Sequence, residues 1–265
     1  MGNIINVNSI KVGYESNIII EDLSLTIKKG SVTTIIGENG CGKSTLLKTI
    51  GRILKPKNGE VLVEEHNVHK TSTKKIAQII GMLPQSPKAP NGLTVCEVVE
   101  YGRFPHKKSN GRLNKEDHEI VDWALAQTDL TEFKDRNINS LSGGQRQRVW
   151  IAMVLAQQTE VILLDEPTTY LDMAYQLEVL QLVQSLNKEK QITVIMVLHD
   201  INQASRFSDE IIMFKKGAII EQGAPSEVMT KEALKKVFHI DAHLINLPDT
   251  NIPVCISYEL LQKED

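Results

Sequence analysis

One nine-residue stretch limits what this chain can fold into more than any other: "GENGCGKST" at positions 37–45. A short apolar run, "VTTII" at 32–36, precedes it, and a helical pattern over 44–53 follows it. The GxxxxGK[ST] phosphate-binding motif requires this strand–loop–helix context. Its glycines let backbone N–H groups converge on phosphate oxygens, and the helix N-terminus adds partial positive charge. The motif therefore predicts a nucleotide-binding α/β core.

Individual loop residues have separate expected roles. Lys43 should reach the β- and γ-phosphates, and Ser44 should ligate Mg²⁺. Because Cys41 lies at a helix N-terminus, we expect a lowered thiol pKa and inactivation by thiol reagents, against which the bound Mg²⁺–nucleotide protects. The alternative is that Cys41 only fills space. The other expected nucleotide-binding residues of the loop are Gly37, Asn39, Gly40, Gly42 and Thr45.

A second strand ends in two acids, in "VILLDE" at 161–166. Its apolar run is typical of a strand buried on both faces, and open α/β sheets bind ligands at the carboxyl ends of such strands. Adjacent carboxylates repel each other unless a cation or a functional proton is involved. We therefore assign Asp165 to Mg²⁺, partly through water, and Glu166 to orienting and polarising the attacking water. The alternative is a solvated turn at the strand end.

Two further polar residues follow apolar segments. His199 ends the predicted strand "TVIMVLHD" at 193–200, and its imidazole can bond a γ-phosphate or hold the water of Glu166. A lone histidine after an apolar strand is more often structural, but the position parallel to the two acids favours a functional role. Gln85 lies in "MLPQSPKAP" at 82–90 and, on composition alone, is an ordinary loop glutamine.

The stretch "LSGGQRQR" at 141–148 looks like a second anion-binding site. Ser142 is a good N-cap, and the glycines behind it expose backbone N–H groups. Arg146 and Arg148 fall in the first turns, where the helix dipole already makes the field positive. Their position indicates an anion or carboxylates nearby, unless the stretch is only a capped helix with solvated arginines.

The remaining pattern alternates between strands and helices. The first 36 residues read as strands, 72–81 as a helix, and 94–158 as mostly helical. Strands return at 161–166 and 193–200, separated by a helix over about 173–188, and a hairpin follows at 210–223. This pattern predicts an α/β core of parallel character with an α-rich insert.

Composition excludes several classes of protein. The 265 residues carry a net charge of −3, so no global feature points to nucleic acid. Three widely spaced cysteines form no CxxC pair, which favours a reducing cytosol. No apolar run approaches the roughly 20 residues that cross a bilayer, and we expect no signal peptide. A function at a membrane would need another chain.

The order "GENGCGKST", "LSGGQ", "VILLDEP" and "YLD", followed by His199, resembles the ATP-binding cassette family from Tyr14 to about Val237. The resemblance implies a single P-loop NTPase domain: a RecA-like mixed sheet with an N-terminal antiparallel β subdomain and an inserted α-helical subdomain. We expect the catalytic core at about 1–85 and 159–240, and the helical signature subdomain at 86–158. Residues 241–265 would form a short C-terminal extension, a small β element or tail.

The same resemblance implies further roles. Tyr14 would stack on adenine, although core packing of a strand is the alternative. Gln85 would sense Mg²⁺ and the water, and relay to a membrane partner. Asp172 would cross between subunits. Each ATP would be shared between the loop of one copy and the signature of the other, in a homodimer with two equivalent sites. The signature residues that would contact this ATP in trans are Ser142, Gly143, Gly144 and Gln145.

Two longer stretches narrow the resemblance. "LPQSP…GLTVCEVVEYGRFPH" and "LLDEPTTYLDMAYQLEVLQLVQSLN" are similar to ATPase subunits of bacterial iron(III)–siderophore importers, especially the ferrichrome/hydroxamate type. This implies ATP hydrolysis coupled to uptake, with two copies bound to permease subunits at the cytoplasmic face of the membrane. An extracytoplasmic binding protein would supply the cargo, and no nucleic acid would be involved. Alternatives are a vitamin B12 or haem importer, or a soluble cassette ATPase acting on an iron–sulfur scaffold.

A basic stretch between Tyr101 and Lys115 contains five cationic residues and no acid. Such a stretch can face anionic lipid headgroups or an acidic permease loop. The alternative is a solvated loop. The cationic residues are Arg103, Lys107, Lys108, Arg112 and Lys115.

Overall fold

The computed structural model describes residues 2–107, 111–248 and 250–261. Contacts divide the chain into two compact units, one formed by Met1–Lys70 with Thr193–Asp265 and the other by Thr71–Ile192. The boundaries of these two units differ from those expected for the catalytic core and the signature subdomain. The expected subdomain boundaries therefore stay a prediction.

The first unit opens with an antiparallel sheet in the order β2-β1-β4-β5. β1 (Asn3–Tyr14) pairs with both β2 (Asn17–Lys28) and β4 (Asn58–Val63), and β5 (His66–Asn67) extends the edge. The β1–β2 turn needs glycine at Gly13, because a Cβ there would lie 2.1 Å from the backbone oxygen of Asn17.

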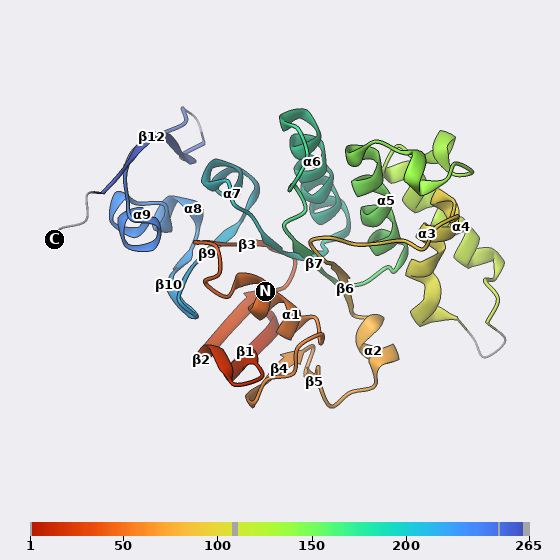
Figure 1. Ribbon diagram of the computed structural model, residues 1–265, viewed down its shortest axis with the longest axis horizontal. Coiled ribbons are helices and arrows are strands. Elements are labelled where there is room, and N and C mark those ends of the chain that lie inside the picture. The colour runs from red at the N-terminus through yellow and green to blue at the C-terminus, as the bar shows by residue number, and fades with distance from the viewer. Residues whose placement is uncertain (1, 108–110, 249, 262–265) are drawn as a thin grey trace. The chain divides into compact units, whose positions relative to one another are not determined.

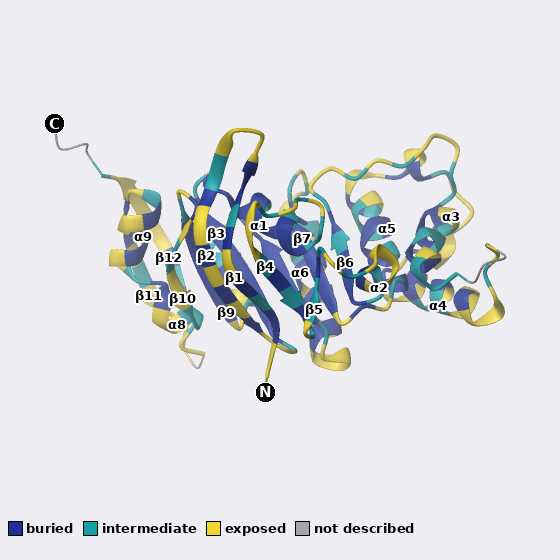
Figure 2. Ribbon diagram, turned by 90° about the horizontal axis from the view of Figure 1, so that it is seen from below, coloured by how far each residue is buried: buried dark blue, intermediate teal, exposed yellow. Residues whose placement is uncertain are grey.

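A second group of strands in this unit has the order β10-β9-β3-β8. β3 (Val32–Gly37) runs parallel to β8 (Thr193–Val197) and β9 (Glu210–Lys215), and β10 (Ala218–Gly223) is antiparallel to β9. Every residue of β3 and β8 is buried, as expected for strands covered on both faces (Figure 2). Because parallel strands share a carboxyl edge, the segments after β3 and β8 leave from the same side of this group.

Helices and a hairpin complete the unit. Helix α1 (Lys43–Ile50) follows β3, and α7 (Ile201–Phe207) follows β8. After α8 (Pro225–Val228) and α9 (Lys231–Phe238), the small β element expected at the C-terminus is an antiparallel hairpin. Its strands are β11 (Ile240–Asn246) and β12 (Pro253–Leu260).

In the second unit, β6 (Ile80–Leu83) and β7 (Val161–Asp165) are parallel. The helix expected over 72–81 is therefore partly wrong, because α2 is confined to Thr73–Ala77 and a strand begins at Ile80. Ile80 and Leu83 are buried in this strand. A short apolar run fits a buried strand and a helix equally well, so its period alone could not separate the two.

Most helical elements of the second unit lie between β6 and β7 in the sequence, while α2 precedes β6 and α6 follows β7. Figure 1 shows α3, α4 and α5 lying side by side. Among the described residues, no helix is both long and apolar enough to span a membrane. The helical elements are α3 (Val95–Glu100), η1 (Tyr101–His106), α4 (Lys115–Gln127), η2 (Thr131–Phe133), η3 (Ile138–Ser140), α5 (Gly143–Ala156) and α6 (Met173–Lys190).

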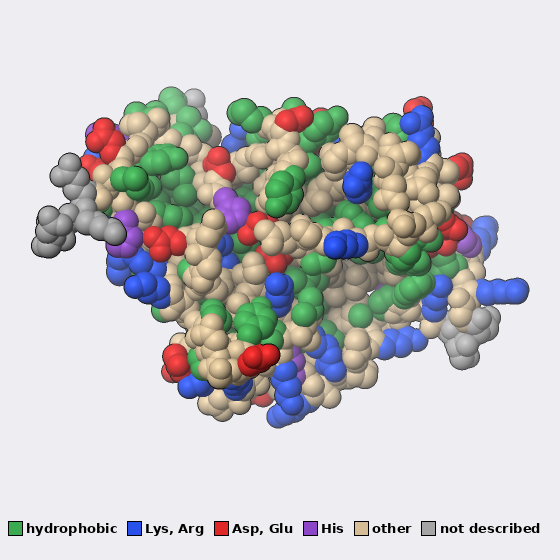
Figure 3. All heavy atoms as spheres, in the orientation of Figure 1, with side chains coloured by type: hydrophobic (Ala, Val, Ile, Leu, Met, Phe, Trp, Pro, Cys, Tyr) green, Lys and Arg blue, Asp and Glu red, His purple; other side chains and the backbone are tan. Residues whose placement is uncertain are grey.

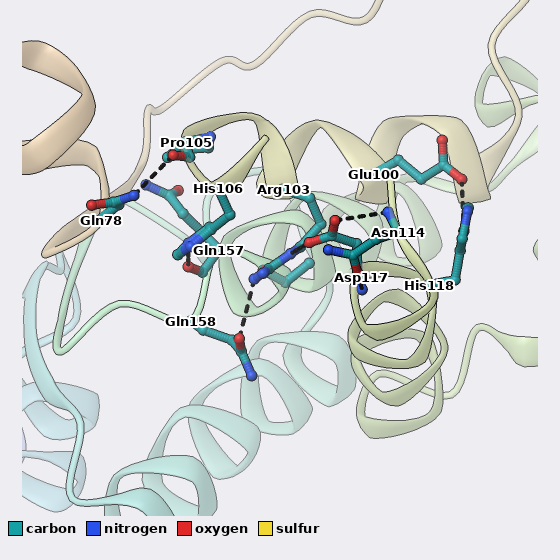
Figure 4. Close-up of polar contacts among 11 residues, drawn as sticks. Gln78, Glu100, Arg103, Pro105, His106, Asn114, Asp117, His118, Gln157 and Gln158 are labelled. Atoms are coloured by element: carbon teal, nitrogen blue, oxygen red, sulfur yellow. Dashed lines mark hydrogen bonds and ion pairs between the residues drawn. The ribbon is translucent and has the colours of Figure 1, made fainter. Parts of the chain in front are cut away.

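A buried ion pair ties three of these elements together (Figure 4). Nε of Arg103 in η1 donates to Oδ1 of Asp117 in α4 at 2.9 Å, and its Nη1 donates to the backbone oxygen of Ala156 in α5 at 2.7 Å. Burial opposes the charge of Asp117, but hydrogen bonds from the Asn114 backbone and from Arg103 prevail and lower the pKa of this carboxyl.

This ion pair changes the expectation that the stretch between Tyr101 and Lys115 forms a cationic surface. Arg103 is only 5% exposed and does not belong to any cationic surface. Lys107 lies over the ring of Phe104, 4.2 Å from its centroid, and exposed Lys115 lies 3.7 Å from Glu119. Lys108 falls outside the described residues. The charge available for a lipid or permease surface is therefore smaller than the sequence suggests.

Candidate nucleotide-binding site

The phosphate-binding loop leaves β3 through three glycines with positive φ. At Gly37 (φ 155°) a Cβ would lie 2.0 Å from the backbone oxygen of Phe214, and at Gly42 (φ 112°) it would lie 3.0 Å from Cγ2 of Ile19. At Gly40 (φ 75°) nothing lies within 4 Å. Two glycines are thus required by close packing, while the third leaves the backbone open at the crest of the loop.

The N-terminus of α1 can receive an anion. Its N-cap is Gly42 in the left-handed region, with no side-chain capping bond and no acid in the first turn. Lys43 is 5% exposed, and its Nζ donates to the backbone oxygens of Gly37 at 2.8 Å and Glu38 at 2.9 Å. Backbone N–H groups at such a helix start, with a lysine held over the loop, suit the oxygens of a phosphate.

The expected lowering of the Cys41 thiol pKa is wrong. The residue is 6% exposed, and burial raises the pKa of its thiol from the ordinary 9.0, although the charge of Lys43 acts in the opposite direction. Desolvation disfavours the thiolate. In the folded chain Cys41 is therefore a buried neutral thiol in the wall of the loop.

Two other predicted residues of the first unit are accessible. Tyr14, the last residue of β1, is 47% exposed, as a stacking platform requires. His199 is also exposed, but it does not end a strand, since β8 stops at Val197. It directly precedes Asp200, which caps α7 by accepting bonds from the backbone N–H groups of Asn202 and Gln203.

In the second unit the two acids end β7 as predicted. Asp165 is 1% exposed, and Glu166 follows it with a left-handed φ of 55°. Nε2 of Gln85 donates to Oε2 of Glu166, so a loop glutamine 81 positions away meets this carboxylate. Thr169 Oγ1 donates to the same oxygen at 3.2 Å. Sequence reasoning missed Thr169, although a hydroxyl three residues after the acid was a usable signal.

The signature stretch forms the start of α5. Ser142 Oγ accepts from the Gln145 backbone N–H at 3.2 Å, and Gln145 Oε1 accepts from the Ser142 N–H at 3.1 Å, a complete capping box. Gly143 has nothing within 4 Å of an added Cβ, whereas at Gly144 a Cβ would lie 2.8 Å from the ring of Tyr175. Gly144 thus lets α5 approach α6 closely.

The arginines of the stretch have partners within the same unit. Arg148 pairs with Glu178 of α6 and lies 3.6 Å from Asp129, which confirms that carboxylates are nearby. Arg146 Nη2 donates to the Leu141 backbone oxygen at 3.1 Å. Asp172 caps α6 by accepting from the Tyr175 N–H at 3.1 Å.

The predicted ligands for Mg²⁺ suit that ion. Ser44, Gln85 and Asp165 would each coordinate a metal through an oxygen atom, the ligand type that hard cations prefer. Among the described residues, no three His, Cys, Asp or Glu side chains form a metal cage. Fold and site together define a P-loop protein that hydrolyses a nucleoside triphosphate.

Comparison with known proteins narrows this class. The family model described as "ABC transporter" matches residues 20–169. The iron(3+)-hydroxamate import ATP-binding protein FhuC of Bacillus subtilis is 54% identical over 262 residues, which are 99% of this chain and 97% of that protein. The chain therefore belongs to the ABC transporter family and is one of its ATP-hydrolysing cassettes.

Solved structures agree with this assignment and confirm the predicted fold class. A putative metal-chelate type ABC transporter in an inward-facing conformation matches with a TM-score of 0.83 and 29% identity, covering 99% of both chains. The dimeric cassette MJ0796, bound to ADP and Pi, matches with a TM-score of 0.73 and 31% identity, covering 83% of this chain and 98% of that chain. The relative MJ0796 is thus a cassette that forms a dimer.

Proposed function

We propose that this chain is the ATP-hydrolysing subunit of a bacterial importer for an iron(III)–siderophore complex, most closely of the hydroxamate type. Two copies would bind a separate permease dimer at the cytoplasmic face of the membrane, and an extracytoplasmic protein would deliver the cargo. The observation that carries this proposal is the 54% identity to the iron(3+)-hydroxamate import protein over nearly the full length of both chains.

Nucleotide binding would use the first unit. Tyr14 offers an exposed ring for adenine, and the open backbone at Gly40 with the uncapped start of α1 receives phosphate oxygens. Lys43 supplies the cation at the β- and γ-phosphates. Ser44 and Asp165 would hold Mg²⁺, which supplies charge neutralisation at the phosphates when bound.

Hydrolysis would depend on Glu166. Its carboxylate orients and polarises the water that attacks the γ-phosphate, and Gln85 bonds to one of its oxygens. His199 would bond the γ-phosphate or this water. These groups position charge rather than form covalent bonds, as phosphoryl transfer requires.

The dimer would explain why one chain has two glycine-led helix starts. Ser142, Gly143, Gly144 and Gln145 of one copy would contact the γ-phosphate held by the loop of the other, and Asp172 would cross the same interface. A two-fold arrangement makes both sites equivalent. The dimeric relative bound to ADP and Pi supports such an assembly.

Glu166→Gln tests the enzymatic part. This variant should bind ATP with unchanged affinity, lose hydrolysis, and accumulate as a dimer with Mg-ATP in size-exclusion chromatography. Lys43→Ala is the matched control, because it should fail at the binding step. A Glu166→Gln variant that hydrolyses ATP at the parental rate would remove Glu166 from the mechanism.

Uptake experiments test the cargo. A strain lacking this protein should lose uptake of ⁵⁵Fe-labelled hydroxamate chelates and regain it with the parental gene but not with Glu166→Gln. The runner-up is another metal chelate, favoured by the match to the metal-chelate type transporter. Unchanged hydroxamate uptake together with lost uptake of labelled haem or vitamin B12 would favour that alternative.

A further inference from the structure

The C-terminal hairpin is fastened to helix α7 by side-chain hydrogen bonds. Nδ2 of Asn202 donates to the backbone oxygen of Cys255 at 3.0 Å, and the Cys255 N–H donates to Oδ1 of Asn202 at 2.8 Å. The amide therefore pairs with β12 as a neighbouring strand would. One helical turn further, Ser205 Oγ donates to the backbone oxygen of Pro253 at 2.6 Å in a buried position.

His199 lies directly before Asp200, the N-cap of the same helix. Asp200 Oδ1 accepts from the backbone N–H groups of Asn202 and Gln203, each at 2.8 Å. Asn202 thus uses its backbone to hold the segment next to His199 and its side chain to hold the hairpin. The side-chain bonds of Asn202 to Cys255 and its backbone bond to Asp200 together connect β12 to the N-cap of α7.

A cleft adjoins both His199 and the C-terminal hairpin. Its volume is about 500 Å³, and it is lined by His199 and Asn202 and by Ile240, Cys255 and Tyr258. Tyr258 is 64% exposed, so the hairpin does not close the cleft over His199. Figure 3 shows hydrophobic side chains gathered over α9 and the hairpin on this face. His199 and the Cys255 segment to which Asn202 bonds thus line the same cleft.

We propose that Asn202 is a positioning residue for His199, and that the C-terminal hairpin acts as the support to which it is anchored. Fastening α7 to β12 fixes the direction in which the chain leaves β8, and hence where the His199 imidazole points. The hairpin thereby contributes to hydrolysis without touching the nucleotide. This inference rests on the proposed role of His199 at the γ-phosphate.

Replacing the amide tests the connection. Asn202→Ala should lower kcat for ATP about 5- to 10-fold and leave KM unchanged, because the nucleotide contacts remain while the alignment of His199 is lost. Asn202→Asp, which keeps only the acceptor for the Cys255 N–H, should fall in between. The matched control is Asn187→Ala: Asn187 Nδ2 donates to the backbone oxygen of Ile192 at 2.7 Å, so this variant also removes a side-chain amide bond to a backbone oxygen. It should lower the melting temperature but not kcat.

A spectroscopic measurement separates positioning from a merely structural role. With ¹³Cε1-labelled histidines, the His199 signal, assigned from His199→Gln, should shift when Mg-ATP is added to the Glu166→Gln background. Asn202→Ala in that background should reduce this shift although ATP still binds. Should Asn202→Ala fold poorly, Ser205→Ala, which leaves the amide in place, should show the same change in weaker form.

The outcomes distinguish the two proposals. An inactive His199→Gln variant together with parental kcat and shift in Asn202→Ala would overturn only the positioning role. A His199→Gln variant that hydrolyses ATP at the parental rate would remove His199 from the proposed mechanism and the role of Asn202 with it. Equal losses of kcat in Asn202→Ala and Asn187→Ala would also overturn the inference, since the effect would then follow stability.

Discussion

The starts of α1 and α5 are both led by glycines and both assigned to phosphate, yet they solve the same problem differently. The first N–H groups of any helix lack intrahelical partners. At α1 no side chain caps them, whereas at α5 the box between Ser142 and Gln145 satisfies two donors. The start of α1 is therefore open to an anion. The start of α5 would have to give up the capping bonds between Ser142 and Gln145 in order to bind a phosphate.

The glycines differ in the same way. In the phosphate loop, Gly37 and Gly42 have positive φ and little room for a Cβ. In the signature, Gly144 is required by the ring of Tyr175, and Gly143 meets nothing. The loop is thus shaped by its own backbone, while the signature is shaped partly by α6. This difference fits one site that holds the nucleotide and one that engages it only on assembly.

The largest effect is expected at the open site. Lys43→Ala removes the buried cation held over the loop, and we expect a loss of about 10²–10³-fold in ATP hydrolysis, the range seen when a donor to developing charge is deleted. ATP affinity by calorimetry should fall as well. Lys48→Ala in the last turn of α1 is the control and should retain activity. Less than a tenfold loss in Lys43→Ala would weaken the assignment of this loop.

Gly144→Ala should have the next largest effect, on stability. Its Cβ would lie 2.8 Å from the Tyr175 ring, and overpacking of this kind costs about 1–3 kcal/mol. Gly143→Ala is a matched control at the first residue of the same helix, because an added Cβ there meets nothing within 4 Å. Urea denaturation should therefore separate the two variants. Similar unfolding free energies would show that α5 does not depend on this close approach.

Ser142→Ala should remove the cap and the proposed trans contact together. Loss of an N-cap costs about 1 kcal/mol, and loss of one phosphate contact of about 1.4 kcal/mol reduces activity about tenfold. Ser142→Asp separates the two roles, since aspartate caps a helix equally well but places a negative charge at the phosphate. We expect it to restore the melting temperature without restoring hydrolysis. Recovery of both would mean that Ser142 acts only as a cap.

The open site could be predicted from sequence because its parts are local. The loop, its strand and its helix are contiguous, and Asp165 and Glu166 end one apolar run. What sequence could not predict depends on distant neighbours. The burial of Cys41 depends on such neighbours. So does the ion pair between Arg103 and Asp117, which lies inside a stretch that looked cationic in the sequence. The hydroxyl of Thr169, three residues after Glu166, was a signal in the sequence, but its bond to that acid depends on how the turn folds.

The smallest effect is expected at Cys41. Its place just before α1 suggests that the helix field lowers the thiol pKa, but the burial of Cys41 has the opposite effect. A helix N-terminus alone would lower a thiol pKa, but burial raises that of Cys41 above its ordinary 9.0. Since the thiolate is the nucleophile, iodoacetamide should modify Cys41 more slowly at pH 8 in the folded chain than in urea. If restricted access alone slowed the reaction, the alkylation rate of the folded chain would be lower by the same factor at every pH.

A raised pKa makes a different prediction for the pH profile. The rate in the folded chain should keep rising at pH values where the rate in the urea-unfolded chain has levelled off, because the folded thiol ionises later. Peptide mass spectrometry of the Cys41 fragment measures both curves, and Mg-ATP should slow the folded rate further. A folded-state rate that levels off below pH 8 would mean that the helix field at α1 outweighs burial, and would restore the view of this loop as a site that activates its thiol.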